Sequence, residues 1–284
     1  MADALPVVYV DGNYVAAADA RISPFDRGFL FADAVYEVVP VFGSNPLLLT
    51  NHLVRLDNSL QELSIPNPHD ETGWSGIIRK LIDENGGGDL AIYIQVSRGA
   101  EVGRDHFFPE NISPTVFAMA TAITPSPKDT GGIAAITLED TRWARCDIKA
   151  TSLLANILLR QEARNQGVDD TILIKDDELI EAASASVITV EGDALIARPN
   201  GSELLPGTTR GLVLDLATND GFELRNEPIS VARLRAADEI WLLSATKGVV
   251  PVIELDGQPV GTGKPGRVWQ RVHELYEANK ALLG

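Results

Sequence analysis

Proline and glycine are concentrated in one short segment near the middle of the chain, residues 121–132. This segment holds two prolines and two glycines within its last eight positions. Such a composition interrupts regular secondary structure and is typical of a connection between compact units. The sequence therefore predicts an N-terminal domain over residues 1–120 and a C-terminal domain over residues 133–284, joined by this linker.

The N-terminal segment alternates short extended runs with one amphipathic helix. The pair Asp11-Gly12 tolerates the positive φ angles of a tight turn, which predicts a hairpin over residues 7–15. A helix is expected to begin near Thr50, a candidate N-cap, and leucines align on its inner face while Arg55 lies beside that face. Further strands are expected over residues 35–42, 91–96 and 115–120.

The C-terminal segment mixes hairpins with helices. A helix over residues 153–166 ends before Gly167, which suits the left-handed position beyond a helix C-terminus. A helix over residues 210–219 follows a hydroxyl cap and ends before Gly221. We also expect a strand over residues 133–138, hairpins over residues 171–182, 187–198 and around Asp256-Gly257, and a terminal helix over residues 267–283.

The composition restricts the partners and the compartment of the protein. A formal net charge of −16 over 284 residues disfavours general binding to nucleic acid or to an anionic membrane. Cys146 is the single cysteine and the four histidines have no paired spacing, which excludes an intramolecular disulfide and disfavours a metal site. Residues 1–10 do not resemble an export signal, and no stretch reaches about 20 apolar residues. We therefore expect a cytoplasmic protein.

Two residues of the C-terminal segment suggest a cofactor. Lys149 precedes a predicted helix, and Glu181 lies near the end of a predicted hairpin strand. A lysine whose amine has lost its proton can hold an aldehyde cofactor as a Schiff base and then move protons. Pyridoxal phosphate (PLP) also needs an acid, because its ring accepts electrons when its nitrogen is protonated. Most lysines and glutamates are solvated, so each residue alone is also compatible with a surface position.

A candidate phosphate site lies at the start of the helix predicted over residues 210–219. Gly207, Thr208 and Thr209 precede this helix, whose first backbone N–H groups lack intrahelical partners and attract anions. Arg55 can add a charge-assisted hydrogen bond to the same phosphate. An ordinary helix cap and a solvated arginine are the alternative interpretation.

A candidate carboxylate site lies in residues 98–106, a polar loop that follows a predicted strand. Arg104 and His106 can bind a substrate carboxylate from this loop, and Tyr36 can position the substrate through its hydroxyl group. An exposed polar loop and a packed tyrosine are the alternative interpretation.

The sequence carries a family resemblance at several separated places. The matching segments are residues 25–38, 52–56, 142–149 and 161–163. Together they resemble fold-type IV PLP-dependent transaminases, and most closely the D-amino acid transaminases, over essentially the whole chain. This resemblance implies an α+β fold class with a smaller N-terminal α/β domain, a larger C-terminal domain with a barrel-like sheet, and the cofactor between the two.

The resemblance also implies roles for individual residues. Lys149 matches the Schiff-base lysine, and Glu181 matches the acid that faces the pyridine nitrogen. The other cofactor-binding positions are Arg55, Leu205, Thr208 and Thr209. The positions that bind the substrate carboxylate are Tyr36, Arg104 and His106. In this family the carboxylate loop reaches in from the neighbouring subunit, which implies a homodimer.

The implied reaction is a ping-pong transamination. A D-amino acid such as D-alanine gives its amino group to the cofactor while Lys149 moves the α-proton, and a 2-oxo acid such as 2-oxoglutarate then accepts the amino group.

Some positions depart from the family pattern. Ala182 and Ala183 stand where the family has glycine and serine after the acid, which removes side-chain donors near the cofactor. Asp105 stands in the carboxylate loop where the family often has alanine, and its negative charge is expected to weaken carboxylate binding or to alter selectivity. Ala245 replaces a threonine that often lies near the phosphate.

Other activities of the same fold remain open. Branched-chain L-amino acid transaminases usually have a glycine soon after the glutamate that Glu37 matches, whereas this chain has Val38 and Val39. An (R)-amine transaminase or an aminodeoxychorismate lyase usually lacks the pair Arg104 and His106. A catalytically silent PLP-binding scaffold would keep the same cofactor residues.

Overall fold

The computed structural model describes residues 3–282, which form two compact units. Unit 1 comprises residues 3–124 together with Ile148–Ser152. Unit 2 comprises Pro125–Asp147 and Leu153–Leu282.

The boundary between the units falls in the proline- and glycine-rich segment. Residues 121–132 contain the end of strand β6 (Thr115–Ala122) and the short helix α4 (Pro127–Gly131). Ser126 caps α4 in a capping box with Asp129, so this part of the segment has regular structure of its own.

Unit 1 is built on a six-stranded sheet with the order β2-β1-β6-β5-β3-β4. All neighbouring strands in it are antiparallel. The hairpin predicted at Asp11-Gly12 is confirmed, with φ angles of 43° and 89° at the turn. The other predicted strands of this unit are confirmed as well. The strands are β1 (Ala4–Val10), β2 (Asn13–Ala16), β3 (Ala34–Phe42), β4 (Asn45–Pro46), β5 (Leu90–Ser97) and β6.

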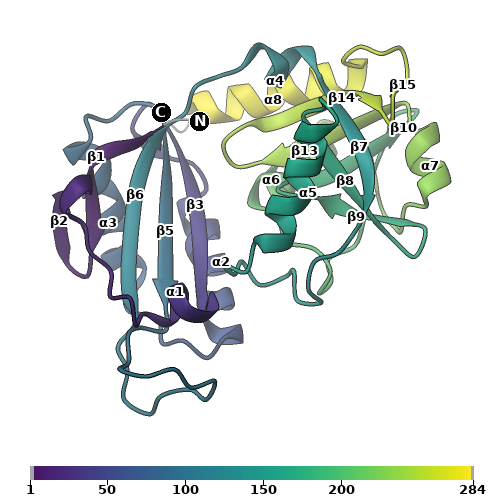
Figure 1. Cartoon of the computed structure of the whole chain (residues 1–284). Helices are drawn as coiled ribbons and strands as arrows, with labels where there is room; N and C mark the ends of the chain where they lie inside the picture. Colours follow the sequence, from purple (N-terminus) through teal and green to yellow (C-terminus); the bar gives the residue numbers. More distant parts are fainter. Residues whose placement is uncertain (1–2, 283–284) are drawn as a thin grey trace. The chain divides into compact units, whose positions relative to one another are not determined.

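Two long helices cover one face of the unit 1 sheet, behind the strands in Figure 1. They are α2 (Leu49–Glu62) and α3 (Glu71–Glu84), and their apolar sides form one core with the sheet. The short helices η1 (Ala17–Asp19) and α1 (Arg27–Phe31) complete the unit.

The cap predicted for α2 is wrong. The helix begins at Leu49, and the residue before it, Leu48, has a φ of 54° and gives no side-chain cap. The Thr50 hydroxyl instead donates to the Glu71 carboxylate, at 2.9 Å. The threonine therefore links the starts of α2 and α3.

Ile148–Ser152 joins unit 1 because it extends the sheet along the edge of β3. Val35 and Ala150 form an isolated antiparallel bridge. The Tyr36 N–H donates to the Lys149 carbonyl at 2.8 Å, and the Thr151 N–H donates to the Ala34 carbonyl at 3.0 Å. The backbone of β3 thus holds Lys149, which lies more than a hundred positions away from that strand in the sequence.

Unit 2 contains a nine-stranded sheet of mixed direction, in the order β12-β11-β10-β13-β14-β7-β8-β9, with β15 paired to β14. The pairs β14-β7, β7-β8 and β11-β12 are parallel and the other neighbours are antiparallel. The three predicted hairpins are confirmed, and Asp176, Asp177 and Asp256 have positive φ angles at two of the turns. The strands are β7 (Ile133–Glu139), β8 (Asp170–Lys175), β9 (Glu178–Ala182), β10 (Ser186–Glu191), β11 (Ala194–Ala197), β12 (Glu223–Asn226), β13 (Glu239–Ser244), β14 (Gly248–Leu255) and β15 (Gln258–Pro259).

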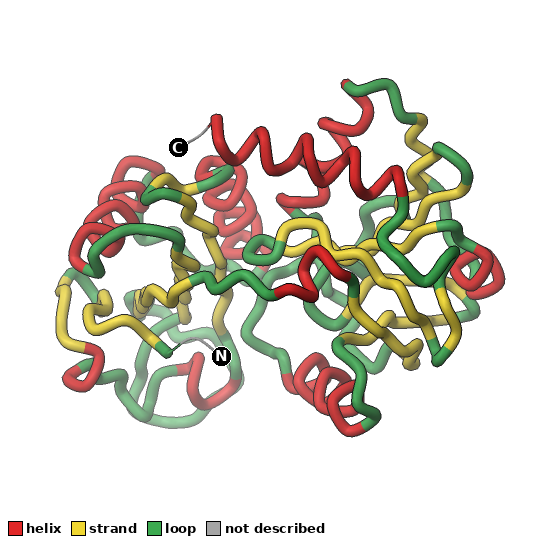
Figure 2. The backbone as a smooth tube through the Cα atoms, turned by 90° about the horizontal axis from the view of Figure 1, so that it is seen from above, coloured by secondary structure: helices red, strands yellow, loops and turns green. Residues whose placement is uncertain are grey.

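The larger helices of unit 2 pack on this sheet. Helix α5 (Leu154–Asn165) connects the parallel strands β7 and β8 and packs on both. Helix α8 (Arg267–Leu282), the long helix of this unit in Figure 2, packs on α6 (Thr208–Asn219) and on β13 and β14. Helix α7 (Val231–Ala236) lies against β9.

The predicted ends of the unit 2 helices are partly confirmed. Gly167 and Gly221, with φ angles of 78° and 98°, take the left-handed positions beyond α5 and α6. The hydroxyl cap predicted for α6 is wrong, because its N-cap is Gly207, which has no side chain to cap the helix. The terminal helix is confirmed as α8, although Leu283 lies outside the described residues. In residues 3–282 no helix is long and apolar enough to cross a membrane.

Candidate active site

Lys149 is held between strand β3 and helix α2 of unit 1. Its carbonyl accepts from the Tyr36 N–H at 2.8 Å, and its own N–H donates to the Ser59 hydroxyl at 3.2 Å. Its Nζ atom lies 4.2 Å from the centroid of the Tyr36 ring. The structure thus brings together the predicted Schiff-base lysine and the predicted substrate-binding tyrosine.

The Tyr36 ring also stacks on Tyr93 of the neighbouring strand. The two ring centroids are 5.6 Å apart, with 26° between the ring planes. The Tyr93 hydroxyl donates to Gln95 at 2.7 Å, and burial raises the pKa of Tyr93. Tyr93 therefore supports Tyr36 as an uncharged ring.

Arg55 lies on the face of α2 that carries Ser59, and a buried carboxylate binds it. Its Nε donates to Glu37 Oε2 at 3.0 Å, and its Nη2 donates to Glu37 Oε1 at 2.7 Å. His52, one turn earlier, places Nδ1 3.0 Å from the same Oε1. The predicted phosphate arginine thus belongs to a buried cluster of three side chains.

The charges of this cluster follow from burial and from its internal contacts. Burial opposes ionisation of Glu37, but the Arg55 guanidinium and the His52 ring hold its pKa well below the usual range. Burial also lowers the pKa of His52, and the attraction of Glu37 only partly opposes this shift. At neutral pH the cluster therefore contains an ionised Glu37 and an uncharged His52, whose Nδ1–H donates to the carboxylate.

The residues of the predicted carboxylate loop meet at the ring of Phe31. The Arg104 Cζ atom lies 4.7 Å from the Phe31 centroid, and the His106 ring centroid lies 5.4 Å from it. Arg27 approaches the same ring at 4.8 Å and donates from Nη1 to the Asp105 carbonyl at 2.7 Å. The structure thus places Arg104 and His106 on one aromatic ring, in a loop that an arginine of helix α1 holds.

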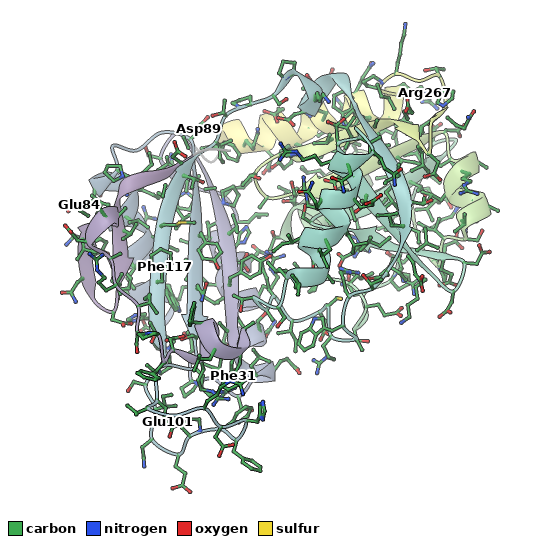
Figure 3. The ribbon with its side chains drawn as sticks, in the orientation of Figure 1. Phe31, Glu84, Asp89, Glu101, Phe117 and Arg267 are labelled. Carbon is green, nitrogen blue, oxygen red and sulfur yellow. The ribbon has the colours of Figure 1, made fainter. Side chains whose placement is uncertain are left out.

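The loop itself is strongly exposed. Figure 3 shows Glu101 on the part that projects beyond the end of the sheet, below Phe31. Apolar side chains of this loop are also exposed, among them Val102 at 90% and Phe107 at 81%. Isolated apolar residues on a surface are common, whereas this loop exposes several of them together.

Glu181 is buried in unit 2 in an ion pair with Arg142. Its other oxygen accepts from the Leu205 N–H at 3.4 Å. Arg142 also donates to Asp140 Oδ2 at 2.7 Å and to the Glu203 carbonyl at 3.1 Å. Burial raises the pKa of Glu181, and Arg142 opposes this rise. The predicted acid and the predicted ring-packing residue are therefore in direct contact.

The start of helix α6 has the form of an anion site. Gly207 is the N-cap, and Thr208 and Thr209 form the first turn. A Cβ atom at Gly207 would lie 2.6 Å from the Ser186 hydroxyl oxygen, so a larger residue there would require a shift. The backbone can therefore approach β10 closely, with the N–H groups of the first turn directed away from the helix.

The two alanines that follow Glu181 are buried, and their backbone is hydrogen-bonded. The Ala182 N–H donates to the Ala185 carbonyl at 2.9 Å. The Ala183 N–H donates to the Thr171 carbonyl, and the Ala183 carbonyl accepts from the Asn156 side chain at 2.7 Å. The departure from the family pattern thus leaves this turn ordered.

Three residues of these sites were not among the predicted positions. Glu37, Arg27 and Arg142 each bind a predicted site residue or its neighbour. All three lie in family-like segments, Arg27 and Glu37 in residues 25–38 and Arg142 in residues 142–149, and their charge within these segments was the available signal. In the described part of the chain, no group of three histidine, cysteine, aspartate or glutamate side chains could hold a metal ion.

The side chains of both units fit PLP. Unit 1 offers an amine beside two stacked tyrosines and an oriented guanidinium, and unit 2 offers a buried carboxylate and an anion-binding helix start. These are the groups that an aldehyde, a phosphate and a pyridine nitrogen require.

Comparison with known proteins gives the same family. The model of the family described as amino-transferase class IV matches residues 34–255. A D-alanine aminotransferase of Bacillus licheniformis is 32% identical over 271 residues, which cover 95% of both chains. A D-alanine aminotransferase of Listeria monocytogenes is 30% identical over 273 residues, with 95% of this chain and 94% of the relative covered.

Solved structures share the fold. The branched-chain amino acid aminotransferase of Escherichia coli matches with a TM-score of 0.89 at 24% identity, and 96% of this chain and 94% of that chain are covered. A hypothetical aminotransferase of Mycobacterium tuberculosis, in its PLP-bound form, matches with a TM-score of 0.84 at 23% identity, with 96% and 98% covered. The predicted fold-type IV architecture is thereby confirmed. The chain belongs to the class IV aminotransferase family, and its cofactor is PLP.

Proposed function

We propose that this aminotransferase exchanges the amino group between a D-amino acid such as D-alanine and a 2-oxo acid such as 2-oxoglutarate. The observation that carries the proposal is the meeting of Arg104 and His106 at the Phe31 ring. A guanidinium and an imidazole on one loop are suited to hold a carboxylate, and both substrates carry one. The D-alanine aminotransferases at 30% and 32% identity support the same substrate class.

Lys149 is the proposed catalytic residue. Its backbone is fixed by Tyr36 and Ser59, so its side chain starts from a defined point at the edge of the sheet. PLP, when bound, supplies an electron sink for the α-carbon of the substrate. The Lys149 Nζ atom binds the cofactor covalently and moves the α-proton of the substrate. Tyr36, beside this amine, positions the substrate.

The other proposed cofactor ligands are anchored by their own partners. Arg55 is oriented by Glu37, and Thr208 and Thr209 stand at the start of α6, so these three residues are suited to the phosphate. Glu181 would keep the pyridine nitrogen protonated, because its ion pair with Arg142 favours the ionised carboxylate against the effect of burial. Leu205, whose N–H donates to Glu181, would pack against the cofactor ring.

A branched-chain L-amino acid transaminase is the second candidate. The similarity of fold to the Escherichia coli branched-chain enzyme favours it. Val38 and Val39 disfavour it, because such enzymes usually have a glycine at this place. An (R)-amine substrate has no carboxylate for Arg104 and His106 to bind.

We also propose that the enzyme is a homodimer of the cytoplasm. Exposed apolar side chains lie on α5 and in the segment between β7 and α5, and burial between two copies would remove them from water. They are Trp143, Leu154, Ile157 and Leu158, all at least 45% exposed. The single cysteine, Cys146, fits a reducing compartment. Light scattering after gel filtration would measure the mass, and a monomer at micromolar concentration would contradict the dimer.

The substrate class is tested by the handedness of the product. Purified holoenzyme is incubated with 2-oxoglutarate and either D-alanine or L-leucine, and glutamate is resolved by chiral chromatography. We expect D-glutamate with D-alanine and little product with L-leucine. L-glutamate formed from L-leucine would instead establish the second candidate. Spectral conversion by the amino donor alone would separate an active enzyme from a silent PLP-binding protein.

A further inference from the structure

Glu37 is an ionised carboxylate in the core of unit 1 to which the proposed chemistry assigns no contact with cofactor or substrate. Its side chain is fully buried, and it accepts from Arg55, from His52 and from the Val38 N–H. Burying a carboxylate costs several kcal/mol, which its partners must offset. An apolar pair of similar size would fill this space at a lower cost in free energy. Packing alone therefore does not explain the charge.

The contacts of Glu37 fix the plane of one guanidinium group. Its two oxygens bind Nε and Nη2 of Arg55, which is the side-on bidentate arrangement. The other N–H groups of this guanidinium, on Nη1 and Nη2, lie in the same plane, which the carboxylate fixes. Glu37 therefore determines the direction from which Arg55 can bind a phosphate.

His52 in turn fixes Glu37. Its Nδ1–H donates to Oε1, the oxygen that also accepts from Arg55 Nη2. Because burial lowers the pKa of His52, the ring stays neutral and adds orientation to the cluster without adding charge. His52 and Arg55 lie three residues apart on α2 and Glu37 lies on β3, so the helix and the strand are linked at this point.

We propose that Glu37, with His52 behind it, is the positioning residue that aims Arg55 at the cofactor phosphate. This inference rests on the proposed phosphate role of Arg55. An arginine without such a partner loses side-chain freedom when it binds an anion, whereas a guanidinium oriented in advance has already lost it. Glu37 thus contributes to phosphate affinity without contacting the phosphate.

The test compares two cofactors that differ only in the phosphate. Apoprotein is titrated with PLP and with pyridoxal. The dissociation constant for pyridoxal divided by that for PLP measures how much the phosphate contributes to binding, and this quotient is the ratio used below. We expect Glu37→Gln to lower this ratio about tenfold, a loss of about 1.4 kcal/mol, through weaker PLP binding at unchanged pyridoxal binding. An unchanged ratio would leave Glu37 a purely structural role. An increased ratio would show that its negative charge opposes the phosphate, and either result would overturn the proposal.

Two further variants distinguish a failure of this inference from a failure of the proposed phosphate role of Arg55. Arg55→Gln must lower the ratio at least as far as Glu37→Gln does. If it does not, the phosphate role of Arg55 is itself wrong. Glu239→Gln is the matched control, since Glu239 is a buried carboxylate of unit 2 that binds Trp241 and the backbone at the start of α8. It is expected to lower the thermal midpoint and to leave the ratio unchanged.

A second pair of variants decides the matter if Glu37→Gln does not fold. His52→Asn places an amide nitrogen near the position of Nδ1 and keeps the donor to Glu37, whereas His52→Leu removes the donor. We expect His52→Asn to retain the ratio and His52→Leu to lower it about threefold, a loss of about 0.7 kcal/mol. Equal ratios in the two variants would overturn the role of His52 as an anchor.

Discussion

Arg27 Nη1 donates a hydrogen bond of 2.7 Å to the backbone carbonyl of Asp105, and this bond ties helix α1 to the loop that carries Arg104 and His106. Arg27 is itself held, because its Nε donates to Asp33 Oδ2 at 2.8 Å. The proposed carboxylate-binding loop therefore depends on a buried arginine that takes no part in binding.

Replacement of Arg27 by glutamine is expected to loosen the carboxylate loop. Arg104 and His106 would then lose orientation, so KM for D-alanine and for 2-oxoglutarate should rise about tenfold, or about 1.4 kcal/mol, while PLP affinity stays unchanged. Steady-state kinetics and a PLP titration provide the two numbers. Arg235→Gln, at an exposed arginine paired with Asp256, is the control and should leave both KM values unchanged. Unaltered KM values in Arg27→Gln would mean that the loop holds its shape by other contacts.

Asp105→Asn is expected to improve binding of the more negatively charged substrate. The Asp105 carboxylate accepts from the Phe107 N–H at 3.1 Å, and asparagine keeps an acceptor oxygen there while it removes the charge. Because 2-oxoglutarate carries two carboxylates, its KM should fall by about two- to fivefold, and more than the KM of D-alanine. The gain should shrink in high salt, since the loop is exposed. A KM for 2-oxoglutarate that is unchanged at low salt would contradict this electrostatic effect.

Lys149→Ala is expected to remove the visible absorption of the bound cofactor and turnover together. The same amine binds PLP and moves the α-proton, and loss of a positioned base alone typically costs on the order of 10² to 10⁴ in rate. Absorption spectra of the dialysed protein and a coupled glutamate assay provide the two measurements. Lys247→Ala, at a lysine of the turn between β13 and β14, is a suitable control for a surface charge. Retention of both signals in Lys149→Ala would exclude this lysine as the catalytic residue.

Arg142→Leu is expected to move the acid limb of the pH-rate profile to higher pH. Burial raises the pKa of Glu181 and Arg142 opposes that rise, so removal of the guanidinium lets the pKa rise further. Activity that requires ionised Glu181 is then lost at a higher pH as the solution is acidified. Stability should fall by about 3–5 kcal/mol, because a buried carboxylate loses its partner. Arg142→Lys keeps the positive charge and should shift the limb less. An identical acid limb in all three proteins would show that Glu181 does not control it.

The parts of the fold that were predictable have local causes. Asp11-Gly12 and Asp256-Gly257 adopt positive φ angles, which few other residues tolerate, and both hairpins follow from them. Helix α3 was absent from the prediction, although Asp70 caps it and Trp74 and Ile78 recur at helical spacing on its buried side.

Other features depend on contacts between distant parts of the chain. Lys149 lies in unit 1 because residue 150 bridges Val35, and no local pattern encodes such a pairing. The ion pairs of Glu37 with Arg55 and of Arg142 with Glu181 join residues 18 and 39 positions apart. The resemblance identified Arg55 and Glu181, but the residues that orient them became visible only when the chain was folded.

His52 is expected to make the stability of the protein depend on pH in the range where histidine titrates. Its pKa is lowered from 6.5 in the folded state by burial, so the unfolded chain binds the proton more tightly. The stability that the uncharged His52 contributes is therefore fully present above pH 6.5 and is lost as the pH falls from there towards the lowered pKa.

His52→Asn keeps the donor to Glu37 but cannot titrate. As the pH falls below 6.5, the unfolding free energy of the wild type should therefore decrease relative to that of His52→Asn, by up to about 1.36 kcal/mol per pH unit. Urea denaturation of both proteins at pH 7.5, 6.5 and 5.5, chosen to span about one pH unit on each side of the histidine value, measures it. Parallel pH dependences in the two proteins would show that the pKa of His52 is the same in the folded and the unfolded states, and a difference of the opposite sign would show that the folded protein binds the proton more tightly. Either result would overturn the lowered pKa of the His52 ring.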